Sequence, residues 1–289
     1  MMLPQRARLG GVRLGQEEMK QRMFGRILVF AAATMVTLGG QAKAFADDPG
    51  YNPQLIGGSP ATEQYEFAAT LLYKDQGERP TPVRCGGALI APEWVITAAH
   101  CVAGRNPADF KVNVGSNDYL GGKIVDAAAF VAHPYWDDTT VKNTGDIALI
   151  KLATPSRARP IKAVREPDAG TPARLIGWGR TVADDPASMP RELLQLDTKL
   201  LPTPACDFGD DFSITPGDLC VERGNDGAAG ACNGDSGSPL LQNVRGEWRI
   251  VGVDSRSGGD SCLATDEVFT STAYYWSWVT STMAAPRSL

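Results

Sequence analysis

The chain has 289 residues, of which 43% are hydrophobic, so it can bury the core of one large domain or of two small ones. Its formal net charge is −5, and residues 55–289 alone carry 21 Lys or Arg against 29 Asp or Glu, a net charge of −8. An acidic product without a basic run argues against nucleic acid or an anionic membrane as a partner.

The first 46 residues have the pattern of a secretory signal peptide. Basic residues, an apolar run and two A-x-A sequences follow in that order: Lys20, Arg22 and Arg26, then 27–38, then 42–44 and 44–46. Twelve apolar residues are too few for a membrane anchor, which needs about 20. The stretch before Lys20 is long for a signal peptide, so Met19 and Met23 are alternative starts. We therefore expect a secreted, extracellular protein.

Residues 47–54 (DDPGYNPQ) are polar and rich in turn formers, which is typical of a pro-segment. From there on, short apolar segments alternate with Gly, Pro and Asp turns. Strands are predicted at 88–90 and 94–97, which flank a hairpin turn at 91–93, and at 146–152, 194–200, 247–253 and 268–270. A helix is predicted at 274–283, before a tail at 284–289. This pattern indicates an all-β barrel or sandwich.

All six cysteines follow the signal segment: Cys85, Cys101, Cys206, Cys220, Cys232 and Cys262. An even number in an exported chain indicates disulfides, and six cysteines allow 15 pairings. Zinc is disfavoured because His100 and His133 are the only histidines and no C-x-x-C pair occurs. We expect neither a metal nor a cofactor.

Three short motifs contain residues that could take part in catalysis: TAAHC with His100, GDIAL with Asp146, and GDSGSP with Ser236. Each alone is weak evidence, because a lone His, a turn Asp and a Gly-flanked Ser are usually structural. Together they supply a nucleophile, a base and a carboxylate that holds the base in one tautomer. The chain order His, Asp, Ser is the one found in chymotrypsin.

From residue 55 to 283 the sequence resembles the trypsin/chymotrypsin family of secreted serine endopeptidases. TAAHC, DIALIKL and GDSGSP carry this resemblance. It implies that His100 is the general base and acid, that Asp146 orients it, and that Ser236 is the nucleophile. It also implies an oxyanion hole made of the backbone N–H groups of Gly234 and Ser236.

The resemblance implies a fold of two packed antiparallel β-barrels with a short C-terminal helix, and a triad in the cleft between the barrels. It pairs Cys85 with Cys101, Cys206 with Cys220, and Cys232 with Cys262. A further match to the family lies at residues 177–179 (GWG). His133 matches nothing catalytic, and its His-Pro-Tyr context predicts a surface loop.

Activation is also implied. Leu55 begins the sequence LIGG, where mature enzymes of the family start, and its freed ammonium would pair with Asp235. The family usually starts with Ile or Val after a basic residue, whereas here Leu55 follows Gln54. The expected partners are therefore protein or peptide substrates and an activating protease that is not trypsin-like.

The expected substrate pocket departs from the family. Its residues are Gly230, Ala231, Asp254, Ser255, Arg256, Ser257 and Glu267. Gly230 stands where trypsin-like enzymes have an Asp, and Glu267 stands where Gly is usual. Either Glu267, with Asp254, attracts Lys or Arg side chains, or Arg256 neutralises Glu267 and leaves an apolar slot. The sequence leaves both readings open.

The leading hypothesis is peptide-bond hydrolysis through an acyl-enzyme by a protein secreted as a zymogen. The alternative is a catalytically weak or inactive trypsin-like binding module, which Arg256 in place of the usual aromatic residue would favour. A lipase or esterase of another fold is disfavoured, because it would have the order Ser, Asp, His and a G-x-S-x-G turn.

Overall fold

The computed structural model describes residues 55–137, 144–165, 167–209 and 212–285. The chain divides into two compact units, 1–48 and 49–289, and all described residues belong to the second unit. The expected signal peptide (1–46) and pro-segment (47–54) therefore lie outside the described residues, as do the last four residues of the expected tail.

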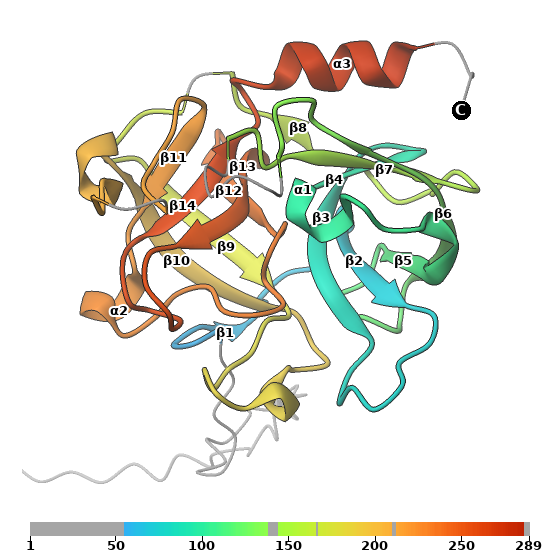
Figure 1. Ribbon diagram of the computed structural model, residues 1–289, viewed down its shortest axis with the longest axis horizontal. Coiled ribbons are helices and arrows are strands. Elements are labelled where there is room, and N and C mark those ends of the chain that lie inside the picture. Colours follow the sequence, from blue (N-terminus) through green and yellow to red (C-terminus); the bar gives the residue numbers. More distant parts are fainter. Residues whose placement is uncertain (1–54, 138–143, 166, 210–211, 286–289) are drawn as a thin grey trace, which may run out of the picture. The chain divides into compact units, whose positions relative to one another are not determined.

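Six antiparallel strands form a first closed barrel, in the order β2-β3-β4-β7-β6-β5. It is drawn in cyan and green in Figure 1. Its strands are β2 (Ala68–Tyr73), β3 (Val83–Ala91), β4 (Trp94–Thr97), β5 (Phe110–Val114), β6 (Lys123–Ala132) and β7 (Ala148–Leu152). β3 and β4 form the predicted hairpin, with Ala91 opposite Trp94.

A second antiparallel barrel follows, in the order β10-β11-β14-β13-β12-β9, and pairing of β9 with β10 closes it. Its strands are β9 (Pro172–Gly177), β10 (Leu194–Leu201), β11 (Asp218–Val221), β12 (Pro239–Val244), β13 (Glu247–Ser257) and β14 (Glu267–Ser271). Two short strands extend its sheet: β1 (Ser59–Pro60) pairs with β10, and β8 (Lys162–Ala163) lies parallel to β13. The expected architecture of two barrels is confirmed.

The described helices are few and short. They are α1 (Ala99–Val102), α2 (Gly224–Gly227) and α3 (Trp276–Ala284), with 3₁₀ turns at Pro107–Asp109, Pro186–Ser188 and Thr203–Cys206. The predicted C-terminal helix thus starts two residues late and reaches one residue into the expected tail. None of these described helices has the length and apolar character needed to cross a membrane.

The two barrels share an apolar core, which explains why β7 is apolar almost throughout. Ala148 and Ile150 point into the first barrel, whereas Leu149 belongs to a cluster that also holds Val253 of β13 and Val279 of α3. Both faces of β7 are therefore buried, and its alternating side chains join the two barrels into one packed body.

β10 follows the predicted alternation with one exception. Leu194, Leu196 and Leu200 are buried, and Asp197 and Lys199 are exposed, but Gln195 is buried as well. β1 covers this position, since Ser59 pairs with Gln195. The Gln195 side-chain oxygen accepts hydrogen bonds from Tyr65 Oη (3.1 Å), the Thr62 backbone N–H (3.1 Å) and Arg174 Nη1 (3.3 Å), so its burial leaves that oxygen satisfied.

Three disulfides cross-link the barrels internally. They join Cys85 to Cys101, Cys206 to Cys220, and Cys232 to Cys262, and the described residues include no free cysteine. These are the pairs that the family resemblance implied. Each closed loop stabilises the fold mainly by restricting the unfolded chain, by about 3 kcal/mol for loops of this size.

Candidate active site

Neighbouring strands of the first barrel bring His100 and Asp146 together. His100 lies in α1, just after β4, and Asp146 lies just before β7, which pairs with β4. The His100 Nδ1 lies 2.8 Å from Asp146 Oδ2, and the His100 backbone N–H donates to Asp146 Oδ1 at 2.9 Å. Ser255 Oγ, from the second barrel, donates to Asp146 Oδ2 at 2.7 Å. Three donors therefore fix one buried carboxylate.

The charges of this pair stabilise each other. Burial alone would raise the pKa of Asp146, but the charge and hydrogen bonds of His100 outweigh it and hold the pKa below its ordinary value. For His100, burial disfavours the imidazolium, yet Asp146 outweighs this effect and raises the pKa. Asp254 acts in the same direction. Because Asp146 occupies Nδ1, the other ring nitrogen of His100 is the one available as a base.

Ser236 stands on a turn that is held between the two barrels. The Gly86 backbone N–H of β3 donates to the Ser236 carbonyl at 2.9 Å, and the Gly237 N–H donates to the Asp254 carbonyl at 2.8 Å. Gly237 has φ +76°, and a Cβ there would overlap Thr97 Oγ1, so only glycine fits. Ser236 and His100 line one cavity, and Ser236 also lines a second cavity beside it.

The turn that carries Ser236 also presents two backbone donors. Gly234 has φ +103°, and a Cβ there would lie 2.7 Å from the Met189 methyl group. Within the described part of the chain, the N–H groups of Gly234 and Ser236 donate to no protein acceptor. Both residues line the cavity that His100 shares. Free N–H groups beside a nucleophile are what an oxyanion hole requires.

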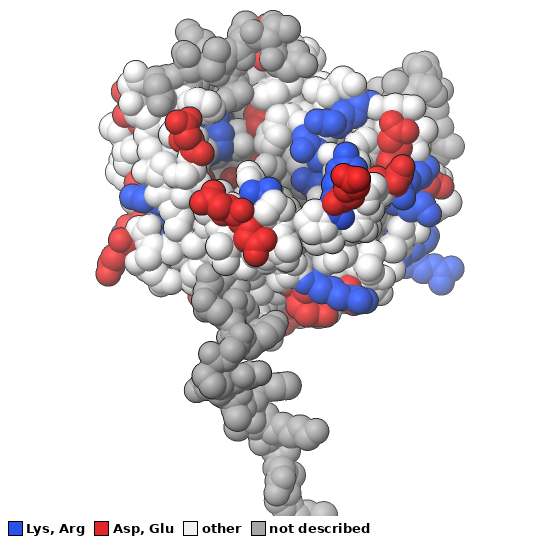
Figure 2. Space-filling view, turned by 60° about the horizontal axis from the view of Figure 1, so that its bottom comes forward, with Lys and Arg blue, Asp and Glu red and all other residues white. Residues whose placement is uncertain are grey.

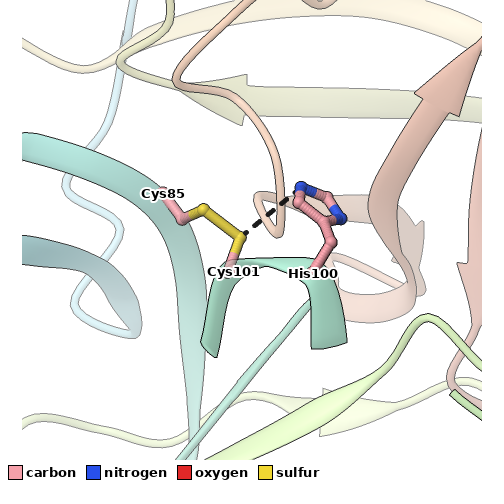
Figure 3. A group of neighbouring side chains, drawn as sticks. All are labelled: Cys85, His100 and Cys101. Carbon is pink, nitrogen blue, oxygen red and sulfur yellow. Dashed lines mark hydrogen bonds between the residues drawn. A yellow bond between two sulfur atoms is a disulfide. The ribbon is translucent and has the colours of Figure 1, made fainter. Parts of the chain in front are cut away.

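The Cys85–Cys101 disulfide lies against His100 (Figure 3). The Cys101 Sγ is 3.7 Å from His100 Nε2, and Cys85, Cys101 and His100 form a compact group of atoms that commonly bind metals. Metal binding by cysteine requires a thiolate, and here both sulfur atoms are used in the disulfide. Cys85, Cys101 and His100 are therefore not a metal centre, and the disulfide anchors α1 to β3.

Asp235 is fully buried, and among the described residues no cationic side chain is bonded to it. Its carboxylate accepts hydrogen bonds from the backbone N–H groups of Gly179 (2.8 Å) and Cys232 (3.0 Å). Side chains at Gly177 or Gly179 would overlap this carboxylate, which explains the glycines of the GWG sequence. Burial raises the pKa of Asp235 well above its ordinary value.

Leu55 does not contact Asp235 through any polar group described in the structure. It is buried in an apolar cluster with Ala229 and Ala231, and the next residue, Ile56, pairs with Gly230. Leu55 is preceded by Gln54, so its nitrogen belongs to a peptide bond in this chain. Leu55 and Asp235, the two expected parts of the activation switch, are thus both buried, but no described hydrogen bond or ion pair joins them.

The expected pocket residues do come together. A cavity next to Ser236 is lined by Ala231, Asp254, Ser255, Arg256, Ser257 and Glu267. Gly230 is not among the described residues that line this cavity, but it lies close to one of them, since a Cβ at Gly230 would lie 3.1 Å from Glu267 Oε1.

Arg256 does not neutralise Glu267, so that alternative is wrong. Its guanidinium pairs with Asp218 Oδ2 at 2.8 Å and donates to the Phe212 and Ser213 carbonyls. It also donates to Ser255 Oγ at 3.2 Å. A β-bulge in β13 shifts the register between Asp254 and Arg256 and turns the Arg256 side chain towards β11.

His133 is another correction, because the expected surface loop buries its side chain to 7% exposure. Its ring packs edge-on against Tyr135, Tyr275 and Trp278, at centroid distances of 4.8–5.0 Å. Its Nδ1 accepts a hydrogen bond from the Tyr135 backbone N–H at 3.2 Å. Aromatic residues around α3, distant in the sequence, therefore turn a loop histidine into a core residue.

Comparisons with known proteins agree with this geometry. A sequence model of the family described as Trypsin matches residues 55–279. Chymotrypsin-C of Bos taurus is 33% identical over 248 residues, 80% of this chain and 89% of the bovine protein. Chymotrypsin-like elastase family member 1 of Macaca fascicularis is 31% identical over 274 residues, 90% of this chain and 99% of the relative.

Two further relatives extend the comparison. A trypsin of Sarcophaga bullata is 34% identical over 207 residues, 68% of this chain and 78% of the insect protein. Among solved structures, neuropsin, a serine protease expressed in the limbic system of mouse brain, superposes with a TM-score of 0.67 at 26% identity. That match covers 78% of this chain and 98% of the neuropsin chain.

Proposed function

This chain belongs to the trypsin family of serine endopeptidases, and we propose that it hydrolyses peptide bonds with His100, Asp146 and Ser236. One observation carries this proposal: the buried Asp146 carboxylate holds the Nδ1 edge of His100 at 2.8 Å, and His100 shares a cavity with Ser236. This arrangement leaves Nε2 to act as the base for the serine hydroxyl.

The proposed reaction has two halves. Ser236 Oγ attacks the peptide carbonyl while His100 Nε2 takes the hydroxyl proton, and the Gly234 and Ser236 N–H groups stabilise the oxyanion. His100 then gives the proton to the leaving amine, which forms an acyl-enzyme. In the second half, water attacks the acyl group while His100 accepts a proton from it; the bond from the acyl carbon to Ser236 Oγ then breaks, His100 returns the proton to Oγ, and the acid product leaves.

The proposal extends to secretion and latency. The signal-like pattern of residues 1–46 supports export, and the three disulfides suit an oxidising compartment. Cleavage after Gln54 by an activating protease would create an ammonium group at Leu55. A buried carboxylate without a cationic partner is costly, so Asp235 would gain most from that new charge.

Covalent labelling tests this function. We expect diisopropyl fluorophosphate to label the processed protein once, and peptide mass spectrometry to place the label on Ser236. Only a serine that is activated by a base reacts in this way. The His100→Ala variant, matched in every other respect, should react far more slowly. A processed protein that stays unlabelled would instead be a binding module without activity, and the proposal would be wrong.

A further inference from the structure

The cavity that His100 shares with Ser236 lies where the leaving half of a substrate would pass. Ser236 lines this cavity and also the one that holds Glu267, but of these two His100 lines only the first. In the proposed reaction His100 gives its proton to the leaving amine, so the chain that carries this amine runs beside His100. The residues that follow the scissile bond are therefore expected in this cavity.

Three arginines line this cavity, and no Asp or Glu is among its described lining residues. Arg79 lies in the turn between β2 and β3, Arg84 lies in β3, and Arg180 follows the GWG sequence. The cavity has a volume of about 370 Å³, whereas a single water needs about 10–15 Å³, so an amino-acid side chain can enter it. Its charge is thus of one sign, and it has room for a ligand.

Arg84 is held directly beside the catalytic residues. Its Nη2 donates to the His100 carbonyl at 3.3 Å, and the next residue, Cys85, forms the disulfide with Cys101. The buried Arg84 Nε has no hydrogen-bond partner in the part of the chain that the structure describes. The protein therefore offsets only part of the cost of removing this charge from water, and a carboxylate in the cavity would offset more of it.

The surroundings of Arg84 are short of negative charge. Burial lowers the pKa of its guanidinium, and the positive charges of Arg105 and Arg79 lower it further, while Tyr73 acts in the opposite direction. An arginine in a protein stays protonated in spite of such a shift. The repulsion between these guanidinium groups is therefore a standing cost, which an acidic ligand would reduce.

The other two arginines of the cavity also keep their charge unpaired by any acid. Arg180 Nη1 donates to the Ala183 carbonyl at 3.1 Å, and the exposed Arg79 donates to the Gln76 carbonyl at 3.1 Å. None of the ion pairs among the described residues includes one of the three arginines. Neutral carbonyl groups accept their hydrogen bonds but do not cancel their charge.

Acidic residues do lie in the neighbourhood, but in other cavities. Asp75 and Asp109 line a cavity that Arg79 also borders, and Asp184 lines the cavity of Glu267. On the face that Figure 2 shows, acidic and basic side chains are interspersed. The outer surface there is therefore mixed in charge, and selection by charge of one sign has to come from the cavity.

We propose that this cavity binds the acidic side chain of a residue that follows the scissile bond, and that Arg84 and Arg180 select for it. This inference rests on the proposed peptidase function and adds a substrate class on the leaving-group side. Guanidinium groups form strong, charge-assisted hydrogen bonds with carboxylates. Arg79 is exposed, so it adds an attraction that salt screens.

Peptides that differ in one residue test the inference on the processed enzyme. They share a sequence up to the scissile bond that the enzyme cleaves, and the first residue after the bond is Glu, Gln or Lys. A second set varies the second residue after the bond in the same way. In at least one set we expect kcat/KM to be about tenfold higher for Glu than for Gln, and lowest for Lys, since hydrogen bonds to charged groups are worth this much. Raising NaCl from about 0.05 M to about 0.5 M should reduce the preference for Glu.

Variants identify the groups responsible. Arg84→Gln and Arg180→Gln should each lower the Glu-to-Gln ratio of kcat/KM at least about threefold, with the Gln peptide as the internal reference. Arg157→Gln is the matched control, because it removes the same charge from an exposed residue that lines neither cavity beside Ser236. It should leave the ratio unchanged.

Acyl transfer by the unmutated enzyme avoids variants that fail to fold. An added amine can attack the acyl-enzyme in place of water: His100 accepts a proton from the amine, the bond from the acyl carbon to Ser236 Oγ breaks, and His100 returns the proton to Oγ. With one ester substrate throughout, dipeptide amides that contain Glu should capture more of the acyl group than their Gln counterparts. Only the leaving-group side differs between these reactions, so the ratio of captured product reports on that side alone.

The outcomes separate the two levels of the proposal. Equal kcat/KM for the Glu and Gln peptides in both sets, or a preference for Lys, would overturn the acidic selection and leave the peptidase function standing. A preference for Glu that survives in both arginine variants, or equal capture of the matched dipeptide amides, would also overturn it. Cleavage of no peptide, with no label at Ser236, would overturn the peptidase function and this inference with it.

Discussion

His100 and His133 are the chain's only two histidines, and their surroundings shift their pKa values in opposite directions. Burial lowers the pKa of His133, whose contacts are mainly aromatic. Burial acts on His100 in the same direction, but Asp146 outweighs it and raises the pKa. The two rings thus differ in the carboxylates near them: Asp146 first, and Asp254 after it, favour the imidazolium of His100, which is the physical basis of the base that we assign.

Proton NMR can follow both rings in the processed protein. We expect one imidazole to titrate above the ordinary histidine pKa of about 6.5 and the other below it. In Asp146→Asn, the higher value should fall, because the charge that favours the imidazolium is lost, and the lower value should stay in place. His133→Gln assigns the second signal. Two values that both lie below 6.5 in the unmutated protein would contradict the His100–Asp146 pairing.

The pH dependence of activity follows from the upward shift of the His100 pKa. A neutral His100 is the active base, so activity is lost as pH falls through its pKa. Since that pKa is raised in the free enzyme, kcat/KM should decline on acidification at a higher pH than an isolated histidine would dictate. We expect this decline for a peptide substrate that has the uncharged residue Leu before the scissile bond. A rate on this substrate that is independent of pH from 8 to 5 would exclude His100 as the base.

At the scale of elements, the β-bulge of β13 sets the directions of three consecutive side chains, those of Asp254, Ser255 and Arg256. It lets Ser255 reach Asp146, while Asp254 faces the cavity and Arg256 turns to Asp218 of β11. The side chains of Arg256 and Asp218 are 5% and 0% exposed, so the attraction between them is offset by the cost of removing both charges from water. Losing one partner leaves the other charge buried alone, which is the more costly state.

Urea unfolding with intact disulfides measures this pair. We expect Asp218→Ala to lower the free energy of unfolding by about 3–5 kcal/mol, because Arg256 stays buried without its partner. The double variant Asp218→Leu and Arg256→Met should recover much of the loss. As a control, Glu222→Ala removes the exposed partner of Lys199 and should cost less than about 1 kcal/mol. An equally small loss in Asp218→Ala would contradict the buried pair.

The sequence predicted features that depend on neighbouring residues better than features that depend on distant contacts. The local patterns predicted an all-β fold, and the family resemblance carried by three short motifs implied the two barrels and the candidate triad. The partner of Arg256 lies 38 residues away, in a strand whose sequence gives no sign of it. The burial of Gln195 requires its pairing with β1, and that of His133 requires α3. Such contacts exist only once the fold has formed.

At the scale of the whole molecule, the start of the domain lies against the pocket. Leu55 is buried beside Ala229 and Ala231, and Ile56 pairs with Gly230. Asp235 directly precedes Ser236, and within the described part of the chain its carboxylate accepts hydrogen bonds from backbone N–H groups only. A new charge at Leu55 would therefore act on the segment that carries both the pocket and the nucleophile. This is the physical reason for expecting a latent precursor.

N-terminal sequencing of the active enzyme tests latency. We expect the active form to start at Leu55 and the precursor that retains residues 47–54 to be at least about a hundredfold less active. Asp235→Asn, processed at the same bond, should be similarly weak, since an amide cannot pair with the new ammonium. Full activity in a protein that starts at Asp47 would show that no such switch exists.

The central claim is that Ser236 and His100 work as one catalytic unit, and casein hydrolysis by the processed variants tests it most directly. We predict that Ser236→Ala and His100→Ala each lower kcat about 10⁴-fold or more with the fold intact, and that the double variant is no worse than either single one. Casein hydrolysis by Ser236→Ala at the rate of the unmutated enzyme would contradict the account.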